Sequence, residues 1–111
     1  MEREKKITLP IKKQWFDMIL NGQKKQEYRE IKPYYTKRLC NMFDLGEKSL
    51  LDWLHRGSFQ NIDVTFRNGY SGNSPSFTVP CMLFIGKGKE EWGAVPGVEY
   101  FIFQIQKTPK H

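Results

Sequence analysis

The apolar positions of this chain alternate with polar ones in some segments and recur every three or four residues in others. Alternation is typical of a strand with one buried face, and the wider spacing is typical of a helix. The alternating segments predict strands at 5–11, 62–67, 77–85 and 98–106. The wider spacing predicts helices at 12–21, 33–43 and 49–56. Turn-rich stretches predict loops at 68–75 and 86–97, and a tail follows at 108–111.

Three residues predict where these elements end or break. Gly22 predicts the end of the first helix, because glycine readily adopts the left-handed conformation found after a helix. Pro33 predicts the start of the second helix, where its missing N–H costs nothing. Pro80 lies inside the predicted strand 77–85 and donates no hydrogen bond to a neighbouring strand. It therefore predicts an edge position or a bulge for that strand.

Residues 25–31 predict a strand of a different kind, since neither of its faces is apolar. Glu27 and Arg29 lie two residues apart and therefore point to the same side of a strand. We expect them to form an ion pair at the wall of a cleft, with Lys24 at its lip. Lys24 and Arg29 can hold a phosphate. Glu27 can accept a hydrogen bond from the amino group of a nucleobase, or act as a general acid or base. The alternative is an ion-pair network that only closes one end of the fold.

The order of the elements favours an α+β fold. A strand, a helix, a polar strand, two helices and three further strands fit a small, mostly antiparallel β-barrel with flanking helices. A chain of 111 residues is long enough for one domain with a single modest core. We therefore expect a single domain that spans residues 1–111.

The segment 22–29 has the pattern Gly-x-Lys-x-x-Glu-x-Arg and follows a short amphipathic helix. Together with the strand Ile7–Ile11 before it and the closing strand Tyr100–Ile105, it resembles the ASCH domain, a member of the PUA-like superfamily. In these features the chain looks similar to small ASCH-like proteins of Gram-positive bacteria and their phages. The resemblance implies a PUA-like β-barrel with flanking helices and a cleft used for RNA-related ligands.

The charge is distributed unevenly along the chain. The formal net charge is +6, and residues 1–38 carry all of the excess, with 11 Lys and Arg against 5 Asp and Glu. A basic patch beside a polar cleft attracts nucleic acid, although a lysine-rich surface also serves solubility. We therefore expect RNA or a nucleotide as the partner.

Other features limit the function classes. The charged N-terminus lacks a signal-peptide core and no apolar stretch approaches the length of a membrane span, so we expect a cytoplasmic protein without a membrane partner. Cys40 and Cys81 match no zinc spacing and are expected to be reduced, packed thiols. His55 and His111 have no partner in the sequence pattern, and phosphate-binding glycine motifs are absent. We expect no metal and no cofactor.

Two loops supply weaker candidates for the walls of the cleft. In the first, Arg67 can hold a phosphate, Asn68 can contact a base edge and Tyr70 can stack on a base. Alternatively, Asn-Gly is a plain turn and Tyr70 packs over the barrel. In the second loop, Lys89 and Trp92 are candidates, with Trp92 either stacking on a ligand or packing as a lid. The eight candidate ligand-binding residues are thus Lys24, Glu27, Arg29, Arg67, Asn68, Tyr70, Lys89 and Trp92.

Three functions are compatible with these residues. The first is a module that binds RNA or a nucleotide. The second is a small hydrolase of the amidohydrolase or ribonuclease type, with Lys24 and Glu27 as catalytic residues. In one branch of the ASCH-like proteins, which hydrolyses the amide of an acetylated cytidine, a nucleophilic Thr occupies the position at which this chain has Glu27. The third is a protein-interaction module of phage origin that uses the helical segment Asn41–Phe59.

Two expectations follow for substitutions and packing. Lys24→Ala and Glu27→Gln should abolish ligand binding and leave the melting temperature within a few degrees. Trp15 and Trp53 lie on apolar helical faces and are expected in the core.

Overall fold

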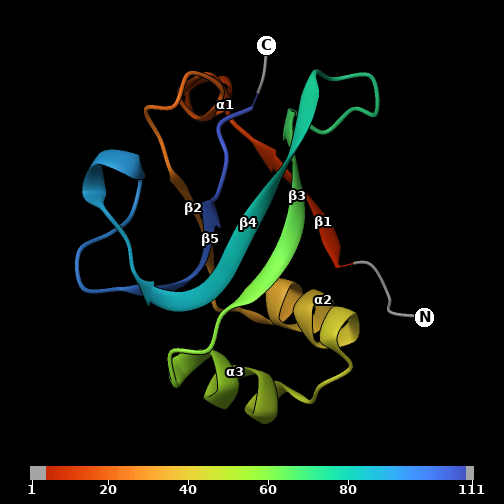
Figure 1. Ribbon diagram of the computed structural model, residues 1–111, viewed down its shortest axis with the longest axis vertical. Coiled ribbons are helices and arrows are strands. Elements are labelled where there is room, and N and C mark those ends of the chain that lie inside the picture. The colour runs from red at the N-terminus through yellow and green to blue at the C-terminus, as the bar shows by residue number, and fades with distance from the viewer. Residues whose placement is uncertain (1–4, 110–111) are drawn as a thin grey trace.

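Five strands form one curled sheet in the computed structural model, which describes residues 5–109 (Figure 1). The strands are β1 (Lys6–Ile11), β2 (Gln26–Glu30), β3 (Gln60–Asn68), β4 (Ser76–Lys87) and β5 (Glu99–Ile105). Their order across the sheet is β1-β3-β4-β5-β2. Within the described residues, three of the four pairings are antiparallel and β1 pairs with β3 in parallel. The predicted strands are confirmed, although residues 1–4 and the last two residues of the predicted tail lie outside the described part.

The sheet does not close into the predicted barrel. β1 and β2 form its two edges, and no strand pairing joins them within residues 5–109. Pro10 near the end of β1 lacks an N–H that could pair with a facing strand. Instead, the Arg29 guanidinium of β2 donates a hydrogen bond of 2.8 Å to the Pro10 carbonyl. The result is an α+β fold with a half-barrel, whose open side between β1 and β2 we call the seam.

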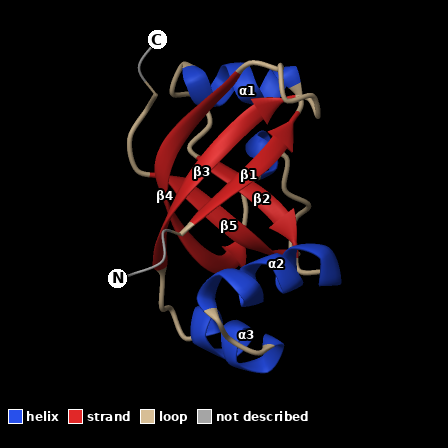
Figure 2. Cartoon of the chain, turned by 90° about the vertical axis from the view of Figure 1, so that its right-hand side faces the viewer, coloured by secondary structure: helices blue, strands red, loops and turns tan. Residues whose placement is uncertain are grey.

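Three helices cover the two ends of the half-barrel (Figure 2). Helix α1 (Lys13–Leu20) lies at one end, and α2 (Pro33–Phe43) and α3 (Glu47–His55) lie at the other. These helices confirm the three predicted ones, and α3 begins two residues earlier than expected. Gly22 has a φ of 86° just after α1, which confirms its predicted role. None of the helices in the described residues is both long and apolar enough to cross a membrane.

The core consists of alternating residues from the strands and one face of each helix. Its fully buried members are Leu9, Ile19, Leu39, Leu50, Leu54, Val64, Phe66, Cys81, Leu83, Phe101 and Phe103. Both cysteines are free, as predicted, and burial raises the pKa of the Cys81 thiol to about 12. This thiol is therefore inert at neutral pH.

Of the two predictions drawn from Pro80, the bulge is wrong and the edge position is confirmed only locally, since β4 pairs with β3 alone at this residue. β4 is a central strand between β3 and β5, and its register with β3 runs unbroken across the Asp63–Pro80 pair. The proline is tolerated because the last β4–β5 pair is Cys81 with Ile105, so Pro80 lies one residue beyond that pairing. Its carbonyl still accepts a hydrogen bond of 2.9 Å from the N–H of Gln106. A proline at this place therefore removes no ladder hydrogen bond.

Candidate functional site

A cleft of about 650 Å³ lies at the seam. The last residues of β1, most of β2, the first turns of α1 and α2, the β3–β4 loop and one residue of β5 enclose it. Its lining comprises Pro10, Ile11, Lys12, Trp15, Glu27, Tyr28, Arg29, Glu30, Lys32, Tyr34, Tyr35, Asn68, Gly69, Tyr70 and Tyr100. This volume is ordinary for a site that holds a small organic molecule. The aromatic rings in the lining make it suitable for a planar ligand.

Three charged side chains, which we call the floor cluster, lie at and beneath the floor of the cleft: Lys24, Glu27 and Arg29. One carboxylate oxygen of Glu27 lies 2.7 Å from Nη2 of Arg29, which confirms the predicted ion pair. The other oxygen lies 3.2 Å from Nζ of Lys24. With all three groups ionised, two cations surround one carboxylate, so the cluster carries one net positive charge.

Arg29 ties three elements together at the seam. Its Nη2 donates to the Pro10 carbonyl of β1, and its Nη1 donates a hydrogen bond of 2.8 Å to the Tyr35 hydroxyl of α2. The planar, multiply donating guanidinium suits this role, which an ammonium group cannot reproduce. Its Nε is buried without a hydrogen-bond partner. Arg29 therefore links the edge strands β1 and β2, which are not joined by strand pairing within residues 5–109.

Lys24 lies beneath the cleft rather than at its lip, which corrects the prediction. Only 1% of the residue is exposed, because its backbone N–H bonds to the Met18 carbonyl and folds the chain under α1. Its Nζ lies 4.6 Å from the centre of the Trp15 ring and 5.2 Å from that of Tyr28. Burial lowers the pKa of Lys24, and the nearby Glu27 partly opposes this shift.

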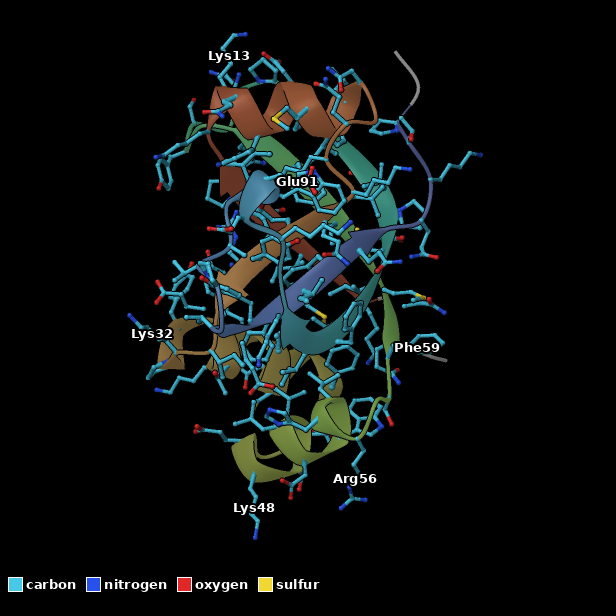
Figure 3. The ribbon with its side chains drawn as sticks, turned by 90° about the vertical axis from the view of Figure 1, so that its left-hand side faces the viewer. Lys13, Lys32, Lys48, Arg56, Phe59 and Glu91 are labelled. Atoms are coloured by element: carbon cyan, nitrogen blue, oxygen red, sulfur yellow. The ribbon has the colours of Figure 1, made fainter. Side chains whose placement is uncertain are left out.

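The β4–β5 loop forms a lid over the floor cluster instead of a wall of the cleft. It contains the short 3-10 helix η1 (Glu90–Trp92), and Figure 3 shows Glu91 over the middle of the molecule below α1. The Trp92 carbonyl accepts a hydrogen bond from Nζ of Lys24. The indole N–H of Trp92 donates a hydrogen bond of 3.0 Å to the Gln23 carbonyl. Lys89 and Trp92 do not line the cleft. Trp92 takes the lid position that was the alternative prediction.

The lid depends on a close approach at Gly88. A Cβ added there would lie 2.5 Å from Cζ of Tyr28 and 2.7 Å from Cβ of Ala94, which is too close for any other residue without movement. The Tyr28 hydroxyl accepts a hydrogen bond of 3.0 Å from the N–H of Lys89. Burial under the lid raises the pKa of Tyr28.

The β3–β4 loop is the predicted wall that does reach the cleft. Asn68 and Tyr70 line it, whereas Arg67 lines a smaller pocket next to it. Tyr70 is 90% exposed, so the alternative in which it packs over the barrel is wrong. The structure thus brings Glu27 and Arg29 together with Asn68 and Tyr70 around one space.

Sequence reasoning missed most of the aromatic lining. Trp15 packs against the core as expected, but it also lines the cleft and contacts the floor cluster. Tyr34 and Tyr35 were assigned no role in the site. The available signal was two adjacent tyrosines in the first turn of a helix, since neighbouring residues cannot both face the core. Tyr34 is indeed 65% exposed at the mouth of the cleft.

The remaining candidates have structural roles. Trp53 packs partly buried against the core, with its ring 5.7 Å from that of Phe43. His55 has a partner that the sequence did not indicate, because its Nε2 lies 3.2 Å from a Glu99 carboxylate oxygen. No group of three or more His, Cys, Asp or Glu side chains within residues 5–109 is arranged to hold a metal ion.

Neither family models, curated proteins nor solved structures yield a match to this chain. We therefore infer the function from the chemistry of the cleft. Glu27 places a buried acceptor at the floor, while Lys12 and Lys32 place cations in the lining. Such a site can hold a planar ligand that donates hydrogen bonds inward and carries negative charge outward.

Proposed function

We propose that this chain is an RNA- or nucleotide-binding domain of the ASCH, PUA-like type, and that the cleft at the seam receives a nucleobase. One observation carries the proposal: the carboxylate of Glu27 is buried at the floor of a cleft lined by aromatic rings. Bases stack on aromatic side chains in single-stranded RNA recognition, and their edges hydrogen-bond to polar groups deeper in the site. The Gly-x-Lys-x-x-Glu-x-Arg segment, which resembles the ASCH motif, supplies that floor.

Glu27 favours a base with an exocyclic amino group. A carboxylate has about four lone-pair sites, and the floor cluster uses one on each oxygen, so acceptor capacity remains for a ligand. The amino groups of cytosine, adenine and guanine donate to carboxylates, whereas uracil has no such group. The cleft should therefore bind the three amino bases in preference to uracil.

The charge around the cleft supports an anionic ligand. Lys12 and Lys32 belong to the basic segment 1–38 and line the opening. Lys32 forms an exposed ion pair of 2.9 Å with Glu30, which leaves Lys12 as a further cation at the opening. The phosphates of a nucleotide or of RNA would supply the matching negative charge.

One observation favours the hydrolase as a second candidate. Burial lowers the pKa of Lys24, and a lysine with a lowered pKa can act as a general base. We place hydrolysis second because Nζ of Lys24 is directed to Glu27 and the Trp92 carbonyl, and Lys24 does not line the cleft. A reaction at this lysine would require the lid to open. No contact of the described residues favours the protein-interaction module.

Calorimetric titration with cytidine, adenosine, guanosine, uridine and N4-acetylcytidine tests the proposal, with short single-stranded RNA as a further ligand. We expect binding of at least one amino nucleoside about tenfold or more tighter than uridine, as for a lost hydrogen bond to a charged group. Product analysis of the same mixtures should recover every ligand intact. Equal affinity for uridine would contradict the assigned role of Glu27, no binding would contradict the proposal, and turnover would favour the hydrolase.

A further inference from the structure

A second, smaller pocket of about 230 Å³ adjoins the cleft. Its lining comprises Thr8, Pro10, Tyr34, Arg38, Arg67, Gly69 and Tyr70. Four of these residues also line the cleft: Pro10, Tyr34, Gly69 and Tyr70. The two pockets therefore lie side by side, near enough for one ligand to contact the lining of both.

The second pocket concentrates positive charge. Arg38 and Arg67 both line it, and none of its lining residues is acidic. Within residues 5–109, neither guanidinium has a carboxylate within ion-pair distance. Two unpaired cations that face one small hollow repel each other, and an anion between them removes that repulsion.

Arg67 also has an unused hydrogen-bond donor. Its Nε is buried and has no hydrogen-bond partner in the structure. A buried donor without an acceptor costs free energy, and native proteins rarely leave one in that state. Because Nε is closed to water, it is equally closed to a ligand oxygen of the same size. The donors of Arg67 that remain for an anion in this pocket are therefore the two Nη groups.

Arg38 is held at the other side of this pocket by an aromatic ring. Its guanidinium carbon lies 5.6 Å from the centre of the Tyr34 ring, and Tyr34 lines both pockets. A guanidinium placed over a ring keeps its N–H groups free at its edges. The same tyrosine can therefore contact a base in the cleft and position a cation for the group attached to that base.

We propose that the second pocket is a phosphate subsite, in which Arg38 and Arg67 bind a phosphate of the ligand whose base occupies the cleft. This inference rests on the proposed function, and it makes the ligand a nucleotide or RNA rather than a free nucleoside. Two guanidiniums match a phosphate in charge and in fork geometry. The pocket has about a third of the cleft volume, which suits a compact anion better than a second stacked base.

Calorimetric titration of phosphorylated and unphosphorylated ligands tests the subsite. The probes are adenosine, cytidine and guanosine, their 5′- and 3′-monophosphates, and the corresponding dinucleoside monophosphates. We expect a phosphate to increase affinity about tenfold or more for at least one of these series. Arg67→Ala and Arg38→Ala should each remove most of that gain and leave the affinity for the nucleoside within about twofold. A gain confined to the dinucleoside monophosphates would assign the phosphate to an RNA chain.

Arg56→Ala is the matched control, because it removes the same charge from a residue that lines neither pocket. Figure 3 shows Arg56 at the α3 end of the molecule. It should leave the gain intact, and the salt dependence of nucleotide binding should fall only in the Arg38 and Arg67 variants. A phosphate gain that is absent, or that persists in both of those variants, overturns the subsite while nucleoside binding stands. If none of these probes binds, the proposed function itself is overturned.

Discussion

The floor cluster and the rim of the cleft, which Tyr34 and Tyr70 form, differ in how strongly their side chains are fixed by neighbouring groups. The floor residues Lys24 and Glu27 are 1% and 7% exposed, and ion pairs and hydrogen bonds fix them on several sides. The rim residues Tyr34 and Tyr70 are 65% and 90% exposed. Substitutions at the floor therefore change folding and binding together, whereas substitutions at the rim separate the two.

The burial of Lys24 and Glu27 argues against the expectation that Lys24→Ala and Glu27→Gln would leave the melting temperature almost unchanged. The sequence pattern indicated polar residues suited to a ligand, but the structure buries both in an ion-pair network with Arg29, which links the two edges of the sheet. Removing one member of a buried charge cluster leaves its partners uncompensated. The geometry of the floor therefore cannot be changed without changing stability, so the rim offers the cleaner test of function.

Glu27→Gln should have the largest effect. It leaves the buried Lys24 and the partly buried Arg29 without their shared carboxylate, and breaking a buried ion pair costs about 3–5 kcal/mol of unfolding free energy. Urea denaturation at neutral pH measures this loss. Glu30→Gln is the control on the same strand, because its ion pair with Lys32 is exposed and should contribute less than about 1 kcal/mol. Equal losses in the two variants would contradict the distinction between floor and rim.

Arg29→Lys should have the next largest effect on stability. Lysine keeps the charge beside Glu27, but it cannot also donate to both the Pro10 carbonyl and the Tyr35 hydroxyl. Loss of these hydrogen bonds should lower the unfolding free energy by about 1–3 kcal/mol. Hydrogen exchange should show increased opening at the edges β1 and β2 and little change in β4. Full stability in this variant would contradict the role of Arg29 at the seam.

Tyr70→Ala should weaken ligand binding without affecting the fold. Loss of a stacking ring costs about 1–3 kcal/mol of binding free energy per base. Because Tyr70 is almost fully exposed, the melting temperature should not change measurably. Phe59→Ala is the control, since Phe59 is 52% exposed and lies outside both pockets, on the opposite flank from Lys32 in Figure 3. Identical affinities in these two variants would remove Tyr70 from the site.

The smallest effect we expect is a change in the pH dependence of stability, which Lys24→Met should show in addition to losing the ion pair with Glu27. The native pKa of Lys24 lies below its ordinary value of 10.5 because of burial. Between these two values, the unfolded state binds the proton that the native state has lost, so wild-type stability rises with pH there. The variant should lack this contribution, and the stability difference between the two proteins should widen toward pH 10. If the stability difference did not depend on pH, burial would not lower the pKa of Lys24.

The positions of the strands and helices could be predicted from the sequence, because apolar periodicity determines them locally. The Glu27–Arg29 contact could also be predicted, since residues two apart on a strand share a side. The burial of Lys24 could not, because it depends on the β4–β5 lid, 68 residues away along the chain. The open seam and the position of Pro80 likewise depend on which strands pair and where β5 ends. Long-range pairing of this kind leaves no local pattern.

The central claim is that the cleft at the seam binds a nucleotide. The most direct measurement is a titration with adenosine, cytidine and guanosine 5′-monophosphates, followed by ¹H–¹⁵N correlation spectra of the labelled protein. We expect the chemical-shift changes to concentrate on the Trp15 indole and on the backbone amides of Tyr34, Gly69 and Tyr70, while the signals of α3 remain unchanged. If saturating nucleotide leaves these signals unshifted, or shifts mainly the signals of α3, the cleft is not the nucleotide-binding site.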